Sequence, residues 1–146
     1  MATATLNVYS HVLGMNTDVG LIFPERRMRP HVPLEGRKFR VLYLLHGGAQ
    51  DHTSWMRSSR IEWYLRDQDV VVVMPSGHRG FYTDGKHTHR YFTYLTEELP
   101  VIIKNWFAVS GRREPLRPMN QFRRYVHPLF SLRMRAVPDA MGGRVG

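Results

Sequence analysis

A histidine followed by two glycines has the residue types and spacing that could stabilise a negative charge. His46, Gly47 and Gly48 come directly after the apolar run of residues 39–45, which is typical of a buried strand. Two glycines let the backbone turn sharply there and leave its N–H groups unshielded. Such N–H groups can bind the oxyanion that forms when a carbonyl is attacked. A glycine turn without any chemistry is the alternative interpretation of these three residues alone.

The strands that would position this motif follow from the hydrophobic pattern. Residues 39–45 and 70–74 are apolar runs with helical material between them, which predicts parallel strands covered on both faces. Residues 5–12 and 18–23 are β-prone and flank a turn-prone cluster, which predicts an antiparallel strand pair. Residues 24–38 are rich in Arg, Pro and Gly, and we predict a loop for them.

Two helical regions are predicted after the motif. Residues 54–66 could hold one or two helical turns, with Glu62 and Arg66 spaced for an exposed ion pair. In residues 91–107 apolar side chains recur every three or four positions, which predicts a long helix. Pro100 interrupts it, so we expect a kink or a fresh first turn there.

Composition predicts one globular domain. The chain has 146 residues, of which 42% are hydrophobic and 12% aromatic. It has no cysteine, which excludes disulfides, thiolate catalysis and cysteine-ligated zinc. A basic patch followed by an apolar stretch does not occur at the N-terminus, and no run approaches the ~18 apolar residues of a membrane span. We therefore expect a cytoplasmic protein; the sequence does not predict its oligomeric state.

Further short sequence motifs follow one another along the chain. They lie at residues 42–48, 51–55, 72–75, 80–84 and 96–100. Together with residues 9–16 and 19–24, they cover residues 6 to about 113. This combination resembles an esterase family of α/β hydrolases that includes tributyrin esterases, S-formylglutathione hydrolase (esterase D) and the mycolyltransferases. The resemblance implies an incomplete α/β-hydrolase fold, the N-terminal half of the sheet. The prolines and arginines after Gly111 predict a poorly ordered basic tail behind it.

The resemblance also implies a chemistry and a site. The family uses a Ser-His-Asp triad, without a metal or cofactor, to hydrolyse small carboxylic esters or thioesters. The position matching its oxyanion donor is the backbone N–H of Gly48, with His46 and Gly47 as loop scaffold rather than triad members. Asp84 fits a turn or capping carboxylate better than a catalytic one. The candidates near the acyl pocket are Trp55, Phe81, Tyr82 and Asp84.

The sequence departs from the family where the nucleophile is expected. A strand ending in Gly-x-Ser-x-Gly should follow Gly111, and this motif occurs nowhere in the chain. Ser76 and Ser110 precede glycines but have no glycine two positions before them. The run from Ala140 to Gly143 resembles the family's Ser-Met-Gly-Gly, yet an alanine has no hydroxyl that could attack a carbonyl. We therefore assign no catalytic residue and predict little or no turnover.

The charge of the chain is concentrated in its last part. The net charge is +9, and residues 1–110 carry 13 basic and 10 acidic side chains, whereas residues 111–146 carry 8 and 2. We divide the chain into an esterase-like part, residues 1–111, and a tail, residues 112–146. Arginines in the tail could bind nucleic acid or an anionic membrane surface, which is the weaker alternative function. A frameshift or gene truncation after Arg113 would also produce such a tail, and we favour that interpretation.

A metal site is the remaining alternative. His78, His87 and His89 lie near Asp84 in one loop region. Their spacing does not match that of zinc ligands, so we assign no metal.

Overall fold

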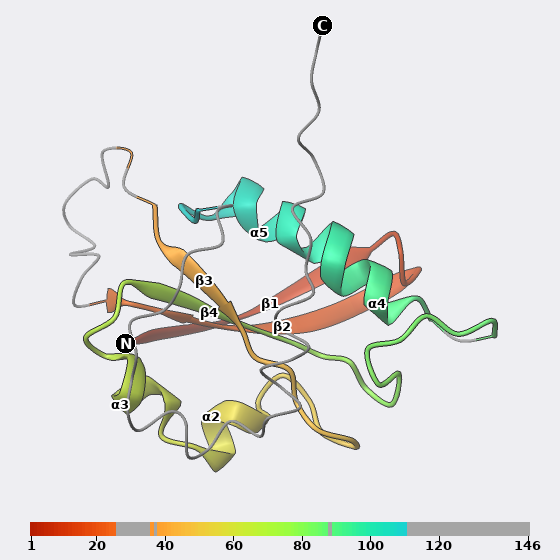
Figure 1. The fold of residues 1–146 in the computed structure, drawn as a ribbon, viewed down its shortest axis with the longest axis horizontal. Coiled ribbons are helices and arrows are strands. Elements are labelled where there is room, and N and C mark those ends of the chain that lie inside the picture. The colour runs from red at the N-terminus through yellow and green to blue at the C-terminus, as the bar shows by residue number, and fades with distance from the viewer. Residues whose placement is uncertain (26–35, 37, 88, 111–146) are drawn as a thin grey trace, which may run out of the picture.

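The computed structural model describes residues 1–25, 36, 38–87 and 89–110. In this part of the chain four strands form one mixed sheet, with helices on both faces (Figure 1). The strands are β1 (Ala2–Ser10), β2 (Met15–Phe23), β3 (Arg40–Tyr43) and β4 (Val70–Pro75). The helices are α2 (Ser54–Ser58), α3 (Ile61–Leu65), α4 (Tyr91–Thr93), the π-helix η1 (Tyr94–Glu98) and α5 (Leu99–Trp106).

The predicted antiparallel strand pair is formed by β1 and β2. The strands pair from Ala2 opposite Phe23 to Ser10 opposite Met15, so both are longer than predicted. The chain reverses at residues 11–14, three residues earlier than the turn-prone cluster indicated. Gly14 closes this turn with a φ of 68°, and its N–H donates to the Ser10 carbonyl at 2.8 Å. Glycine adopts this left-handed conformation without the steric cost of a Cβ.

The sheet has the order β1-β2-β4-β3, in which β4 is antiparallel to β2 and parallel to β3. The predicted parallel pair is therefore confirmed. β4 lies between two strands, and every β4 residue is buried, as predicted for a strand that is covered on both faces. Phe39, just before β3, pairs in parallel with Val109. The chain thus returns beside the start of β3.

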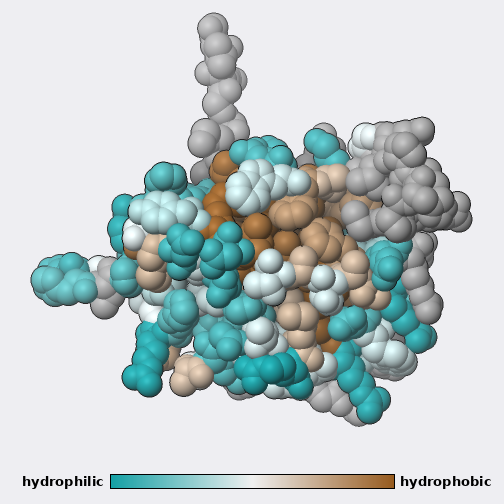
Figure 2. Space-filling model, turned by 180° about the vertical axis from the view of Figure 1, so that it is seen from behind, coloured by the Kyte–Doolittle hydropathy of each residue, from teal (hydrophilic) through white to brown (hydrophobic). Residues whose placement is uncertain are grey.

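Side chains alternate along β4 and enter two cores. Val71 and Val73 pack with β1, β2 and the helix that ends at Trp106. Val70 and Val72 pack with α3 on the opposite face. This alternation follows from the two-residue period of a strand. The face seen from behind carries apolar side chains near its centre, with hydrophilic ones around them (Figure 2).

The predicted helix over residues 91–107 is one continuous element made of α4, η1 and α5. Pro100 is the second residue of α5 and comes directly after the π-helical stretch η1. The backbone stays helical through Glu98, so the irregularity near Pro100 takes the form of this π-helical stretch rather than of a fresh first turn. No helix in the described segments is long and apolar enough to cross a membrane.

Residues 54–66 form the two short helices α2 and α3. The predicted ion pair between Glu62 and Arg66 was wrong: Arg66 contacts the Asp67 carboxylate at 3.2 Å and lies 4.9 Å from the centre of the Trp63 ring. Most of the predicted loop at residues 24–38, and all of the tail, lie outside the described residues.

Candidate functional site

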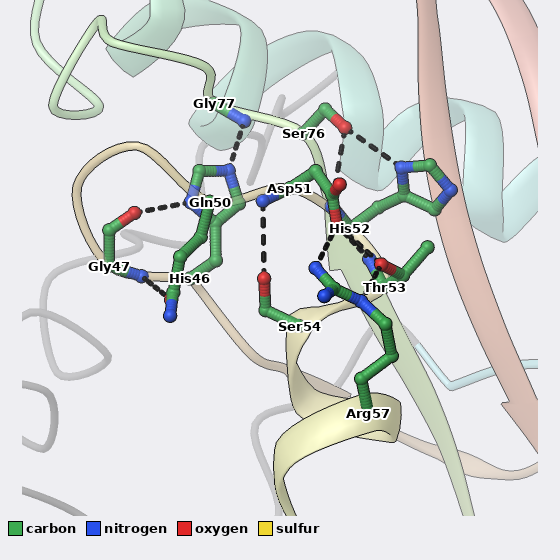
Figure 3. A network of polar contacts seen from close by, with 10 residues as sticks. All are labelled: His46, Gly47, Gln50, Asp51, His52, Thr53, Ser54, Arg57, Ser76 and Gly77. Carbon is green, nitrogen blue, oxygen red and sulfur yellow. Dashed lines mark hydrogen bonds and ion pairs between the residues drawn. The ribbon is translucent and has the colours of Figure 1, made fainter.

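The His-Gly-Gly motif lies in the loop that follows β3, at the edge of the sheet where β4 also ends (Figure 3). The His46 N–H donates to the Tyr82 hydroxyl at 3.0 Å, and the Gly47 N–H donates to Oε1 of Gln50 at 2.9 Å. The N–H of Gly48 has no hydrogen-bond partner among the described residues, and Gly48 is exposed. Tyr82 and Gln50 therefore fix the backbone of this loop at residues 46 and 47, and the Gly48 N–H stays available to a ligand.

The His46 side chain joins the loops that follow β3 and β4. The Gly77 N–H donates to His46 Nε2 at 2.8 Å, and His46 Nδ1 lies 2.7 Å from the Gly47 carbonyl oxygen. This arrangement requires the neutral ring with its proton on Nδ1. Burial lowers the pKa of His46, which favours that form. His46 thus acts as scaffold and has no nitrogen available as a general base.

A second polar cluster fixes the chain after the motif (Figure 3). The Asp51 carboxylate accepts hydrogen bonds from the Thr53 N–H at 2.8 Å and the Thr53 hydroxyl at 2.5 Å, and it lies 3.4 Å from the Arg57 guanidinium. The hydrogen bonds from Thr53 are the largest cause that lowers the pKa of Asp51 to about 2. The Trp55 indole N–H donates to the Leu45 carbonyl at 3.0 Å, which ties α2 to the end of β3.

Among the described residues, Ser76 and His52 form the one contact between a serine hydroxyl and a histidine ring, the pair of groups expected of a nucleophile and its base. His52 Nδ1 lies 3.1 Å from Ser76 Oγ. Ser76 is only 2% exposed, however, and its Oγ also accepts the His52 N–H at 3.4 Å. The neighbouring Asp51 bonds to Thr53 rather than orienting His52. A carbonyl substrate could not reach this hydroxyl, so we interpret the pair as a link between the two loops.

The loop after β4 contains a tight turn at residues 80–83. Phe81 and Tyr82 both have left-handed backbones, with φ of 48° and 54°, and the Thr83 N–H donates to the Gly80 carbonyl at 3.0 Å. The Tyr82 ring packs so closely on Gly77 that a Cβ there would lie 2.3 Å from Cε1 of the ring. Ala49 and His78 are also left-handed. All the left-handed non-glycine residues in the described segments therefore lie in these two loops, and strain of this kind concentrates at functional sites.

Asp84, the remaining candidate from the sequence, serves the helix that follows. Its carboxylate accepts the Thr93 N–H at 3.1 Å and the Thr93 hydroxyl at 2.5 Å. The hydrogen bond from the Thr93 hydroxyl is the main cause of a lowered pKa of Asp84. His89 Nδ1 lies 3.0 Å from the Leu13 carbonyl oxygen. The described residues contain no group of three side chains placed to hold a metal ion.

Sequence reasoning missed the contacts that Gln50, Ser76 and Gly77 make. Gln50 lies three residues after Gly47, which is a common spacing for a side chain that bonds back to the backbone. Ser76 and Gly77 lie 24 and 31 residues from their histidine partners. No local pattern signals contacts at such separations, so these two could not have been found.

The chain is similar in sequence and in structure to known esterases and serine hydrolases. An acetyl esterase from Caldicellulosiruptor saccharolyticus is 31% identical over 119 residues, which are 78% of this chain and 44% of that protein. The fluorophosphonate-binding serine hydrolase FphF of Staphylococcus aureus is 27% identical, with a TM-score of 0.67 over 77% of this chain and 44% of its own. The S-formylglutathione hydrolase FrmB of Staphylococcus aureus is also 27% identical, with a TM-score of 0.62 over the same shares. No protein-family model matches the chain.

The resemblance to esterases of the α/β-hydrolase fold is thus confirmed, and the chain has an incomplete form of that fold. It spans less than half the length of each of these relatives.

Proposed function

We propose that this chain, which is similar to α/β-hydrolase esterases, forms the carbonyl-binding part of a serine esterase for small carboxylic esters or thioesters. We place it in the cytoplasm as part of the same proposal. The observation that carries the proposal is the N–H of Gly48, an exposed residue. This N–H has no partner among the described residues, although the N–H groups of the two preceding residues, His46 and Gly47, are bonded. A hydrogen-bond donor held in this way is suited to an acceptor that arrives with the substrate.

The chemistry follows from that donor. When a nucleophile attacks an ester carbonyl, the carbonyl oxygen becomes an anion, and its hydrogen bond to an N–H strengthens. Because the loop is already fixed through His46 and Gln50, the Gly48 N–H needs no reorganisation as the charge develops. One oxyanion donor contributes about 2.7–4 kcal/mol to transition-state stabilisation.

The proposal includes low activity for the chain as it stands. The sequence contains no Gly-x-Ser-x-Gly, and the one described serine that contacts a histidine, Ser76, is buried. Without a nucleophile and base, an oxyanion donor supplies only a small part of the usual acceleration.

Hydrolysis of 4-nitrophenyl butyrate by the purified chain tests this part. We expect a rate indistinguishable from that of a heat-denatured sample. Turnover that is blocked by an organophosphate would show that a reactive serine is present and would overturn the proposed inactivity.

The competing function is binding of nucleic acid or an anionic membrane through the basic tail. It rests on the excess of basic side chains at residues 112–146, which lie outside the described residues. Counterion release would make such binding weaken steeply with salt. Binding at low salt that is lost on truncation after Gly111 would favour this function, and its absence would remove it.

A further inference from the structure

Two buried hydroxyl groups have no hydrogen-bond partner in the described part of the chain. They are Thr17 Oγ1, on β2, and the Tyr94 hydroxyl, on η1. Thr17 is 3% exposed and Tyr94 is 1% exposed. A hydroxyl loses its hydrogen bonds to solvent when it is buried, so buried hydroxyls are nearly always bonded to the protein or to an ordered water. The burial of these two groups therefore implies a partner.

Thr17 lies under the end of η1. It pairs with Val8, and Ser10 lies two residues further along β1. All three are buried, so their side chains point to the same face of the hairpin. On that face the Glu98 carboxylate, at the end of η1, contacts the Ser10 hydroxyl and accepts the His11 N–H at 2.8 Å. The helix between α4 and α5 in Figure 1 therefore lies over this part of β1 and β2.

Tyr94 enters the same layer from the start of η1. Its ring packs in the core cluster that contains Val8, the partner of Thr17, and Val19, two positions after Thr17. Burial is the largest cause that raises the pKa of the Tyr94 hydroxyl, and the charge of Glu98 raises it further. The hydroxyl is thus held neutral between the helix and the hairpin, on the side where Glu98 contacts β1.

We infer that a water molecule is bound between β2 and η1 and hydrogen-bonds to both Thr17 Oγ1 and the Tyr94 hydroxyl. Each hydroxyl can donate one hydrogen bond and accept others, so one water can accept from one group and donate to the other. Buried waters typically make about three hydrogen bonds to groups that would otherwise be unsatisfied. This water joins the β1–β2 hairpin to the long helix. The inference is independent of the proposed function, because neither hydroxyl belongs to the Gly48 loop.

The sign of the stability change on removing each hydroxyl tests the inference. If the water is bound, Tyr94→Phe removes one of its hydrogen bonds, and we expect the unfolding equilibrium constant to rise about five-fold. Thr17→Val should have a similar effect. If the hydroxyls have no partner, removing either one relieves an unfavourable burial. Either variant being as stable as wild type, or more stable, would overturn the inference.

The double variant shows whether the two hydroxyls share one water. With a shared water, the first substitution already breaks the bridge, so Tyr94→Phe combined with Thr17→Val should cost less than the product of the two single effects. A double effect equal to that product would mean separate partners and would overturn the shared site. Tyr9→Phe and Thr5→Val are the matched controls, because each removes an exposed hydroxyl from β1 and should stay within about two-fold of wild type.

A crystal structure of the wild-type chain provides a readout that needs no variant. We expect one ordered water within about 3.2 Å of both Thr17 Oγ1 and the Tyr94 hydroxyl oxygen. A direct hydrogen bond between the two hydroxyls, or a hydrogen bond from either of them to another protein group in place of the water, would overturn the inference. Two hydroxyls packed only against apolar atoms would overturn it as well.

Discussion

Replacing His46 by alanine is expected to loosen the loop that presents the Gly48 N–H. The imidazole accepts the buried Gly77 N–H at 2.8 Å and lies 2.7 Å from the Gly47 carbonyl oxygen, while only 5% of its surface is exposed. A buried N–H left without an acceptor costs about 1–3 kcal/mol. The cavity left by the ring adds to this cost. We therefore expect His46→Ala to lower the free energy of unfolding by about 2–4 kcal/mol.

Urea unfolding followed by tryptophan fluorescence would measure this change. His46→Gln is the informative companion, because its amide oxygen could accept the Gly77 N–H, and it should lose about half as much. His87→Ala alters an exposed histidine and should stay within about 0.5 kcal/mol of wild type. If His46→Ala were as stable as His87→Ala, or if His46→Gln were no better than His46→Ala, the bridging role of His46 would be refuted.

Two further predictions follow from the same loops. Burial lowers the pKa of His46 in the folded state from its ordinary value of 6.5, so its contribution to stability is complete above pH 6.5 and is lost as the pH falls below 6.5 through the lowered folded-state pKa. The free energy of unfolding should therefore decrease between pH 7 and 5 more steeply in wild type than in His46→Gln. Gly77→Ala would place a Cβ 2.3 Å from the Tyr82 ring and should cost about 1–3 kcal/mol in urea unfolding. Gly48→Ala, whose Cβ would meet Phe81 at 3.8 Å, should cost far less, and equal losses would contradict the packing described.

The strands and the long helix could be predicted because their signals are local. The valines of β4 form an apolar run, and the apolar side chains of residues 91–107 recur with a helical period. The position of β4 between β2 and β3 could not be predicted, since strand order depends on pairings between distant segments.

The candidate site was predictable only in part. Glycines at positions 47 and 48 indicated a sharp turn with accessible N–H groups, which is a property of the residue type. The left-handed conformations of Ala49, Phe81 and Tyr82 could not be expected, because non-glycine residues seldom adopt them. The surrounding contacts impose these conformations.

Activity of a chimera tests the central claim most directly, namely that this chain forms the carbonyl-binding part of an esterase. In the chimera, residues 1–110 replace the matching part of the Caldicellulosiruptor saccharolyticus acetyl esterase. We predict organophosphate-sensitive hydrolysis of 4-nitrophenyl butyrate. Gly48→Pro, which removes the N–H, should lower kcat about 10²–10³-fold, while Gly48→Ala, which keeps it, should retain most of the activity. A folded chimera without turnover, or one in which Gly48→Pro is as active as Gly48→Ala, would contradict the claim.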